Sequence, residues 1–571
     1  MERIHTYDED KVVFHNYDAY VSKVQSCHMT SVASLIEYFK EPIIEDENRE
    51  IFLARAFFMW LANMETNLVH GLPDDINSIL QKNTVHAFAA LCESANIQHQ
   101  VVEGISKGLG YLPGHDESNK GIINFCWNTF KSNDRWHIVD VDRGIFSRTG
   151  YSRGGEILLE SEGQTLLKET EESVGNCVID INDFWFCLNP SIYIFYSFPD
   201  DPEWQLLPIA KRISKAEFFS SPLFQDSFFI AKLHMLSEHT GLLYSKNGKC
   251  TISFGANKVD TRYMSMTYGL SLKKDTVNLN EIDARDLPLL VLYAPSIDTF
   301  TFNIRFPVAA EYIFEIYVSA PDIKYSGCYL FATFKIICSQ PDPNCKKLPL
   351  HTGSTGYGFG YTAIDFGLKN PSTSLPNVHV ECGQKDEVDM TELTFQIDSD
   401  KINEAEFLSD IVGEEHNENV VTNTRVDEIH GKLHVSAGMK KQGEYALSII
   451  ARDKRTDKYF ARIVNYLLTT NSTEEDEEMK LQLKKRKKEL TLQSKLQKRH
   501  EKKDSLTAKI KDIELEIDNL KNSSDEITDD VTVKEDMKKI KSPATMASAT
   551  EGASRNSLKA DVSQSKSCVV L

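Results

Sequence analysis

Residues that could do covalent chemistry lie close together between positions 124 and 140. Cys126 supplies a thiol, His137 an imidazole and Asp140 a carboxylate, and this combination of side chains serves acyl transfer in cysteine enzymes. The spacing argues against a working set, because successive residues of a strand face opposite sides. Cys126 then faces away from whatever position 125 faces, and His137 and Asp140 do not share a face. The histidines in or beside this region are His86, His115 and His137.

The wider segment 101–144 carries spaced glycine, aromatic and polar residues. They are Gly104, Lys107-Gly108, Tyr111–Gly114, Asn124, Trp127-Asn128, and Trp136 four positions before Asp140. This pattern resembles the second half of a transglutaminase-like core, the papain-type fold in which one helix carries a cysteine and two following strands carry a histidine and an aspartate. Upstream, Ala90–Ile97 resembles the body of the cysteine-bearing helix, and Glu50–Asn63 resembles the first core helix. The resemblance implies an α+β core.

The same resemblance indicates that two catalytic positions have changed. The histidine of the family falls at Phe125, and its cysteine falls at Gln81 without a gap or toward Val85 with a short gap. No cysteine occurs from position 28 to position 91, so the loss does not depend on the register, and only Asp140 remains. Because these side chains can neither attack a carbonyl carbon nor move a proton, we predict a pseudoenzyme used for binding, with no cofactor and no metal. The alternative is a cysteine peptidase or transglutaminase that uses a non-standard thiol such as Cys126.

Two downstream segments indicate which branch of the family the chain resembles. Asp183–Pro190 is rich in phenylalanine, and Phe198–Leu207 contains the pattern Pro-x-Asp-x-x-Trp-Gln-Leu-Leu. Both look like the kyphoscoliosis peptidase and hillarin group of cytoskeleton-associated transglutaminase-like proteins, and the likeness covers roughly residues 50–330. It implies a scaffold or adaptor whose partners are cytoskeletal or cell-cortex proteins.

Composition argues against several other classes of protein. The formal net charge of -20 over 571 residues argues against a nucleic-acid binder, because phosphate neutralisation needs clustered Lys and Arg. The 11 cysteines are scattered without a Cys-x-x-Cys pair, so neither a zinc module nor a disulfide framework is indicated. The start at Met1 has no signal-peptide pattern, and no window of ~18 apolar residues occurs. We therefore expect a cytoplasmic protein.

Changes in sequence texture predict six segments. They are an N-terminal extension (1–49), a transglutaminase-like core (50–208), two β-rich domains (209–320 and 321–470), a charged helix or coiled coil (474–522) and a disordered tail (523–571). Short apolar runs between turn residues after position 210 are typical of β-sandwiches. Glu311–Val318 and Glu444–Ala451 both read Glu-Tyr before alternating residues, which indicates two related modules, each ending in such a strand. Residues 150–180 predict a polar loop or edge insertion, and Gly353–Gly360 predicts a flexible loop.

The C-terminal part predicts contacts of another kind. Five apolar residues from Leu506 to Leu520 follow the 4-3-4-3 spacing of a coiled coil, which leaves a homodimer through residues 506–520 and a single solvated helix both open. The chain ends in Cys568-Val-Val-Leu571, a prenylation box whose last residue favours geranylgeranyl transfer to Cys568. One isoprenoid holds a protein to a bilayer only weakly. We therefore expect a lipoprotein peripheral to the cytosolic face of a membrane.

Overall fold

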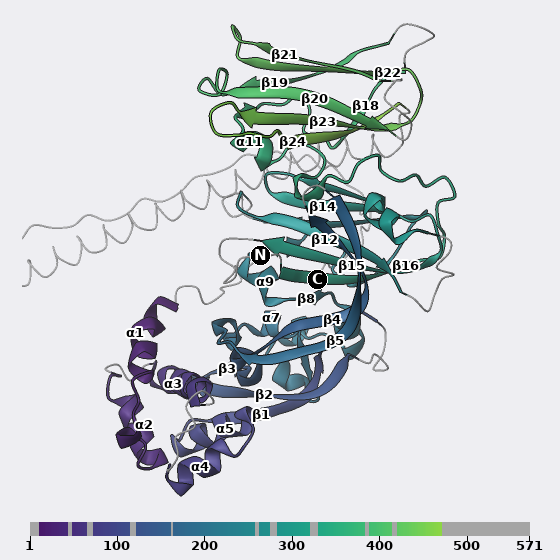
Figure 1. The fold of residues 1–571 in the computed structure, drawn as a ribbon. Helices are drawn as coiled ribbons and strands as arrows, with labels where there is room; N and C mark the ends of the chain where they lie inside the picture. Colours follow the sequence, from purple (N-terminus) through teal and green to yellow (C-terminus); the bar gives the residue numbers. More distant parts are fainter. Residues whose placement is uncertain are drawn as a thin grey trace, which may run out of the picture. The chain divides into compact units, whose positions relative to one another are not determined.

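The computed structural model of the chain describes residues 11–43, 48–64, 72–114, 121–161, 164–256, 262–273, 282–319, 329–382, 388–413 and 420–470. The chain divides into two units, Met1–Asn471 and Ser472–Leu571, and every described residue belongs to the first. The predicted coiled coil, tail and Cys568 lie outside the described residues. Within the first unit, helices come early in the chain and strands dominate afterwards (Figure 1).

The N-terminal part is helical. Its helices are α1 (Lys11–Val21), α2 (Val32–Lys40), α3 (Arg49–Met64), α4 (Asp74–Leu80) and α5 (Thr84–Ser94). α3, which the sequence predicts over residues 50–63, is apolar on several sides, and Phe57, Phe58 and Trp60 are buried. Side chains of α1 and α2 pack in the same hydrophobic core as α3. The described part of the predicted extension therefore shares its core with the residues that follow it.

An antiparallel sheet follows these helices with the strand order β6-β3-β2-β1-β7. The strands are β1 (His99–Lys107), β2 (Ile122–Ser132), β3 (Arg135–Val139), β6 (Phe186–Leu188) and β7 (Ser197–Pro199). α5 packs on β1 and β2. Alternation along β2 sends Phe130 into the helical core and Trp127 into a second cluster on the other face of the sheet. The sheet thus separates two apolar layers.

Residues 146–179 form a long two-stranded ribbon. After α6 (Val141–Ile145), β4 (Phe146–Ser161) pairs antiparallel with β5 (Gln164–Ile179). Of the two alternatives predicted for residues 150–180, the loop was wrong, whereas an insertion agrees with the ribbon, which forms a separate two-stranded sheet. The segment lacks the apolar alternation by which a half-buried strand is recognised in a sequence, and inter-strand backbone hydrogen bonds define it instead.

Two sheets form the first β-rich module. Their orders are β10-β16-β15-β12, with β8 also paired to β16, and β13-β14-β11-β9. Residues of both sheets share one core, which makes the module a β-sandwich. The alternating sequence of β15 buries every second residue, as predicted. The elements of this module are α8 (Lys215–Ser220), β8 (Leu223–Phe224), α9 (Asp226–Ile230), β9 (His234–Met235), β10 (Leu242–Tyr244), β11 (Lys249–Gly255), β12 (Ser265–Leu272), β13 (Val291–Pro295), β14 (Thr299–Arg305), β15 (Ala310–Ser319) and β16 (Tyr329–Cys338).

The second module repeats this architecture with the orders β18-β24-β23-β20 and β17-β19-β22-β21 around its own core. The strands of the two modules correspond in chain order, from β9 with β17 to β16 with β24. With this correspondence, each sheet of the first module has the same strand order as one sheet of the second. In both modules the last strand lies parallel to a short early strand. The elements are α11 (Tyr361–Asp365), β17 (Leu368–Lys369), β18 (Asn377–His379), β19 (Thr391–Ile397), β20 (Ala405–Gly413), β21 (Val420–Asp427), β22 (Lys432–Met439), β23 (Glu444–Asp453) and β24 (Ala461–Thr469).

The two strands that echo each other in sequence occupy equivalent places. On β15 the hydroxyl of Tyr312 donates to the carbonyl of Val308, and on β23 that of Tyr445 donates to the carbonyl of Lys441. Neither is a last strand, because β16 and β24 follow and pair beside them. The predicted boundary between residues 320 and 321 therefore cuts through one sheet: β16 completes the first module.

The segment Gly353–Gly360 lies packed between the two sandwiches. Tyr357 is 1% exposed and its N–H donates to the carbonyl of Tyr293 on β13 at 2.7 Å. Gly356 has φ of 65°, and a Cβ there would lie 2.2 Å from Cδ of Pro295, so this position requires glycine. The prediction of a flexible loop was wrong because the contacts that order the segment come from residues distant in sequence.

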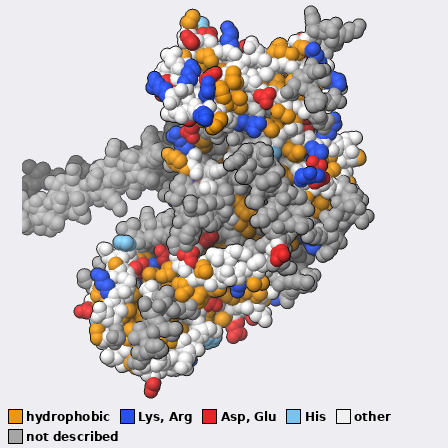
Figure 2. All heavy atoms as spheres, viewed as in Figure 1, with side chains coloured by type: hydrophobic (Ala, Val, Ile, Leu, Met, Phe, Trp, Pro, Cys, Tyr) orange, Lys and Arg blue, Asp and Glu red, His pale blue; other side chains and the backbone are white. Residues whose placement is uncertain are grey.

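The described surface carries basic, acidic and apolar side chains. On the face drawn in Figure 2, Lys and Arg side chains gather over the second sandwich, with acidic and apolar side chains among them. Within the described ranges, no helix combines the length and the apolar character needed to cross a membrane.

Candidate functional site

Helix α5 begins where a nucleophile at a helix N-terminus would lie. Asn83 is the N-cap and accepts a hydrogen bond from the backbone N–H of His86. Val85, in the first turn, is 1% exposed, and its carbonyl accepts a 3.0 Å hydrogen bond from Nδ2 of Asn128 on β2. Gln81 is exposed at the C-cap of α4, before α5 begins. An amide or an aliphatic group thus occupies each candidate position, and neither group is a nucleophile.

Phe125 lies on β2 directly opposite Gly104 of β1. The guanidinium carbon of Arg143 lies 4.8 Å from the centroid of its ring, which is cation–π range. A Cβ at Gly104 would lie 2.2 Å from the carbonyl oxygen of Phe198 on β7, so the backbones of β1 and β7 approach too closely for another residue there. The position at which we expect the histidine of the resembled family is therefore occupied by an aromatic ring that contacts an arginine.

Asp140 is buried at the end of β3, with 1% of its surface exposed. As the N-cap of α6, its Oδ1 accepts from the backbone N–H of Arg143 at 3.1 Å. Its Oδ2 accepts from Nη1 of Arg143 at 2.8 Å and from the hydroxyl of Tyr193 at 3.0 Å. Burial, and then the Asp140 carboxylate, raise the pKa of Tyr193 well above its usual value, so its hydroxyl stays a donor. Asp140 thus caps a helix and balances a cation.

Arg143 is the centre of this network. Besides Asp140, its guanidinium donates to the hydroxyls of Ser106 on β1 and Ser197 on β7. It also lies 5.1 Å from the ring of Trp185, and its side chain is only 20% exposed. The sequence interpretation missed Arg143 and Tyr193. The Asp-x-x-Arg spacing at the start of a helix was the available signal for Arg143, since residues three apart can pair, whereas nothing local points to Tyr193.

The other thiols and imidazoles are not brought together. Burial raises the pKa of the half-buried Cys126, and the Asp142, Glu103 and Asp140 carboxylates raise it further. Burial lowers the pKa of His137. In the described part of the chain, no hydrogen bond joins Cys126 to His86 or His137. The remaining residues of interest are Cys92, which is fully buried in the helical core, and His115, which lies outside the described residues.

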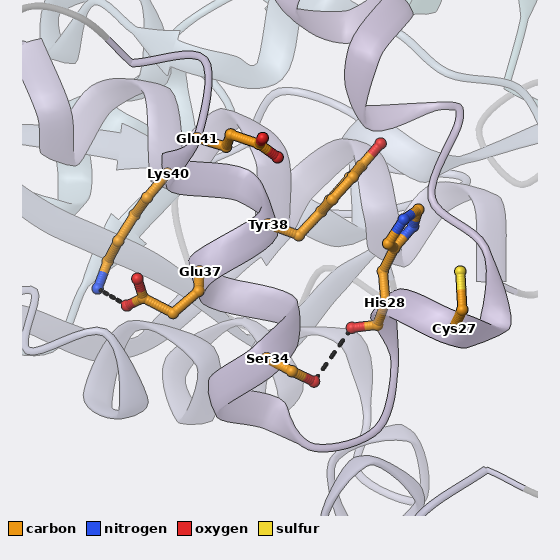
Figure 3. Close-up of a pocket in the computed structure, with 7 residues that line it drawn as sticks. All are labelled: Cys27, His28, Ser34, Glu37, Tyr38, Lys40 and Glu41. Carbon is orange, nitrogen blue, oxygen red and sulfur yellow. Dashed lines mark hydrogen bonds and ion pairs between the residues drawn. The ribbon is translucent and has the colours of Figure 1, made fainter.

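A separate surface pocket of about 610 Å³ lies between residues 26–28 and α2 (Figure 3). It contains a thiol, an imidazole and carboxylates, but each carboxylate has another partner: Glu37 pairs with Lys40 at 2.7 Å, and Glu41 accepts from the hydroxyl of Tyr20. The ring of His28 stacks on Tyr38 at 4.1 Å between centroids. The pocket therefore does not orient an imidazole by a carboxylate as a catalytic triad does. Across the described ranges, no cluster of His, Cys, Asp or Glu could hold a metal ion.

The fold and the network define a class of protein: a mixed chain of helices and sheets whose candidate site is built around a buried Asp–Arg pair. A family model described as the KY-like, immunoglobulin-like domain matches residues 215–349, which include every element of the first sandwich from α8 to β16. This range also reaches past residue 321, in agreement with the pairing of β15 and β16.

Comparison with curated proteins gives relatives of low identity. The chain is 23% identical to kyphoscoliosis peptidase of Mus musculus, over 81% of this chain and 63% of that protein. It is 22% identical to the Lim and transglutaminase domain protein ltd-1 of Caenorhabditis elegans, over 56% of this chain and 45% of that one. For hillarin of Drosophila melanogaster the values are 22%, 52% and 37%. The chain spans less than two thirds of each relative, and the matches confirm the predicted kyphoscoliosis peptidase-like branch.

Proposed function

We propose that this protein is a non-catalytic scaffold or adaptor built on a degenerate papain-like, transglutaminase-like core. The observation that carries the proposal is the Asp140–Arg143 pair with Phe125 against it. Arg143 takes up the carboxylate that would orient a histidine, and its guanidinium stays protonated at physiological pH. It therefore cannot replace the imidazole as a proton acceptor.

In this protein α5 and the sheet β6-β3-β2-β1-β7 form the papain-like core. Partners bind to the surfaces of this core and of the two sandwiches. By resemblance to the kyphoscoliosis peptidase and hillarin group, the partners are cytoskeletal or cell-cortex proteins. Pairing of two chains through residues 506–520 belongs to the same proposal. A fold alone does not fix a partner, so these assignments are tested by binding experiments with the full chain.

Thiol labelling separates the scaffold from an enzyme with a displaced thiol. A reactive cysteine needs an accessible thiolate, whereas the pKa of Cys126 is raised by burial. We expect iodoacetamide near neutral pH to label Cys126 more slowly than the exposed Cys27 and Cys177, with no rapid stoichiometric phase. Mass spectrometry of digests gives the rate at each cysteine. A rapid phase that disappears in Cys126→Ser, but persists in Cys27→Ser, would contradict the proposal and favour the peptidase or transglutaminase alternative.

The membrane part of the proposal rests on Cys568. We expect protein purified from its own cells to carry a geranylgeranyl group on Cys568 and to lack the three residues after it, because residues 568–571 match the Cys-aliphatic-aliphatic-Leu pattern of a prenylation box. Intact-mass analysis and membrane fractionation measure both effects, with Cys382→Ser as the matched cysteine control. Cys568→Ser should shift the protein to the soluble fraction. An unmodified C-terminus with equal fractionation of both variants would remove the membrane from the proposal.

A further inference from the structure

The motif residues Lys107 and Tyr111 take no part in the Asp140–Arg143 network. Lys107 ends β1, and its side chain turns into the protein: the residue is 5% exposed. Its Nζ lies 2.5 Å from Oγ of Ser221 and 3.4 Å from the carbonyl oxygens of Ser221 and Pro222. In the described ranges it has no ion-pair partner, and burial lowers its pKa well below the usual value. Its contacts are therefore neutral ones, and most come from one short segment.

Aromatic rings complete the surroundings of this amine. Nζ lies 5.1 Å from the ring centroid of Tyr111 and 4.7 Å from that of Phe218, both within cation–π range. Tyr111 is itself fully buried, and its hydroxyl donates to the carbonyl of Phe219 at 2.5 Å. The same carbonyl accepts from the N–H of Gly114 at 2.9 Å. One sequence motif, residues 107–114, thus holds the segment 218–222 through both side-chain and backbone contacts.

The segment that is held lies at the start of the Ig-like domain, where the chain still contacts the core sheet. Phe218 and Phe219 of α8 pack with Ile105 and Phe198 of the core sheet. Immediately after Pro222, β8 (Leu223–Phe224) enters the sandwich by pairing with β16. The residues that contact the core sheet are therefore followed directly by residues that pair with a strand of the sandwich.

A residue of the first sandwich also contacts residues 218–222. The N–H of Gly241, just before β10, donates to the carbonyl of Ser220 at 2.7 Å. A Cβ on Gly241 would lie 2.6 Å from Cα of Pro222 and 2.8 Å from Cγ of Pro113. Gly241 thus contacts both residues 218–222 and the motif of residues 107–114. The space between them admits no residue larger than glycine.

We propose that Lys107 and Tyr111 form an interdomain clamp, which fixes residues 218–222 against the core sheet and so keeps the start of the Ig-like domain from detaching from that sheet. The clamp is independent of whether the Asp140 site is catalytic. The buried amine of Lys107 donates to Ser221 and Pro222, and the buried hydroxyl of Tyr111 donates to the carbonyl of Phe219. Detachment of residues 218–222 therefore breaks these hydrogen bonds together.

Limited trypsin digestion of the full chain tests the clamp. Lys211, Arg212 and Lys215 precede the held segment, and cleavage there reports how often α8 detaches when opening is fast relative to cleavage. We expect Lys107→Met to raise the rate of cleavage at these residues by about tenfold or more, and Tyr111→Phe to raise it by a smaller factor, because each removes donors to the segment. Mass spectrometry identifies the cleaved bonds.

Two controls separate opening from general unfolding. Lys82→Met removes an exposed lysine between α4 and α5 and should leave the rates unchanged. Cleavage after Lys454 and Arg455, in the second sandwich, should be equal in all variants. If Lys107→Met does not fold, Tyr111→Phe decides the matter, since it removes one oxygen only. Wild-type cleavage rates at residues 211–215 in folded Tyr111→Phe and Lys107→Met would overturn the proposal, as would a rate increase shared by the second sandwich.

Discussion

Asp140→Ala is expected to lower the free energy of unfolding of the N-terminal core by about 3–5 kcal/mol, because it leaves the charge of Arg143 largely buried without a partner. The N-cap of α6 is lost as well. All 5 tryptophans lie between positions 60 and 204, so tryptophan fluorescence in urea reports on this core and on neither sandwich. If Asp140 were a catalytic residue, Asp140→Ala would instead lower chiefly the turnover rate of the enzyme.

The matched control is Asp134→Asn, which removes the charge of a 97% exposed carboxylate paired with Lys131 and keeps a residue type that tolerates the backbone φ of 58° at this position. It should leave the fluorescence transition unchanged, since exposed pairs contribute little. The double variant Asp140→Asn/Arg143→Met should lose less stability than the sum of its single changes, because the two side chains act as a pair. Equal midpoints for Asp140→Ala and wild type would show that the pair does not hold the core together, and would remove the structural account of why Asp140 is present.

Arg55→Met is expected to lower the stability of the same core by about 1.5–3 kcal/mol, since Asp18, which is 20% exposed, loses its charged hydrogen-bond partner, while water can solvate the 45% exposed Asp183. Arg55, on α3, is 3% exposed. Its guanidinium pairs with both oxygens of Asp18 on α1, at 2.9 and 2.6 Å, and with Asp183 at 2.7 Å. It also lies 5.2 Å from the ring of Phe186. The side chain therefore joins three parts of the chain that are distant in sequence.

Arg135→Met, on the exposed start of β3, is the control for this change and should leave the fluorescence transition in place. Arg55→Lys should fall between the two, because an ammonium cannot match the two-pronged contact with Asp18. Hydrogen exchange supplies a second readout: amides of α1 should lose protection in Arg55→Met before those of α5. Retained protection of α1 would argue that apolar packing alone fixes this helix.

Local patterns predicted a good part of the secondary structure. The resemblance of residues 50–63 to the first core helix of the family predicted α3, and the alternation after Glu311 predicted the burial of β15. The similarity between Glu311–Val318 and Glu444–Ala451 indicated two modules, which do have equivalent strand orders. The last two features are patterns within single strands, which is why the sequence alone reveals them.

Long-range contacts decided the rest. The ribbon of residues 146–179, the packing of Gly353–Gly360 and the place of β16 in the first sandwich all depend on partners far along the chain. No local pattern contains that information, since a polar strand or a glycine-rich segment has no preferred partner until the fold supplies one. The loop at 150–180, the flexible loop at 353–360 and the boundary at residues 320 and 321 were wrong for this common reason.

At the candidate site, the sequence by itself determined which side chains are present: no thiol from position 28 to 91, a phenylalanine at position 125 and an aspartate at position 140. Only the tertiary structure decided what Asp140 does. Folding brings Arg143 and Tyr193 onto its carboxylate and places Ser106 and Ser197 around the guanidinium. The physical reason is that a charge removed from water requires partners, and their identity is fixed by which strands and helices become neighbours.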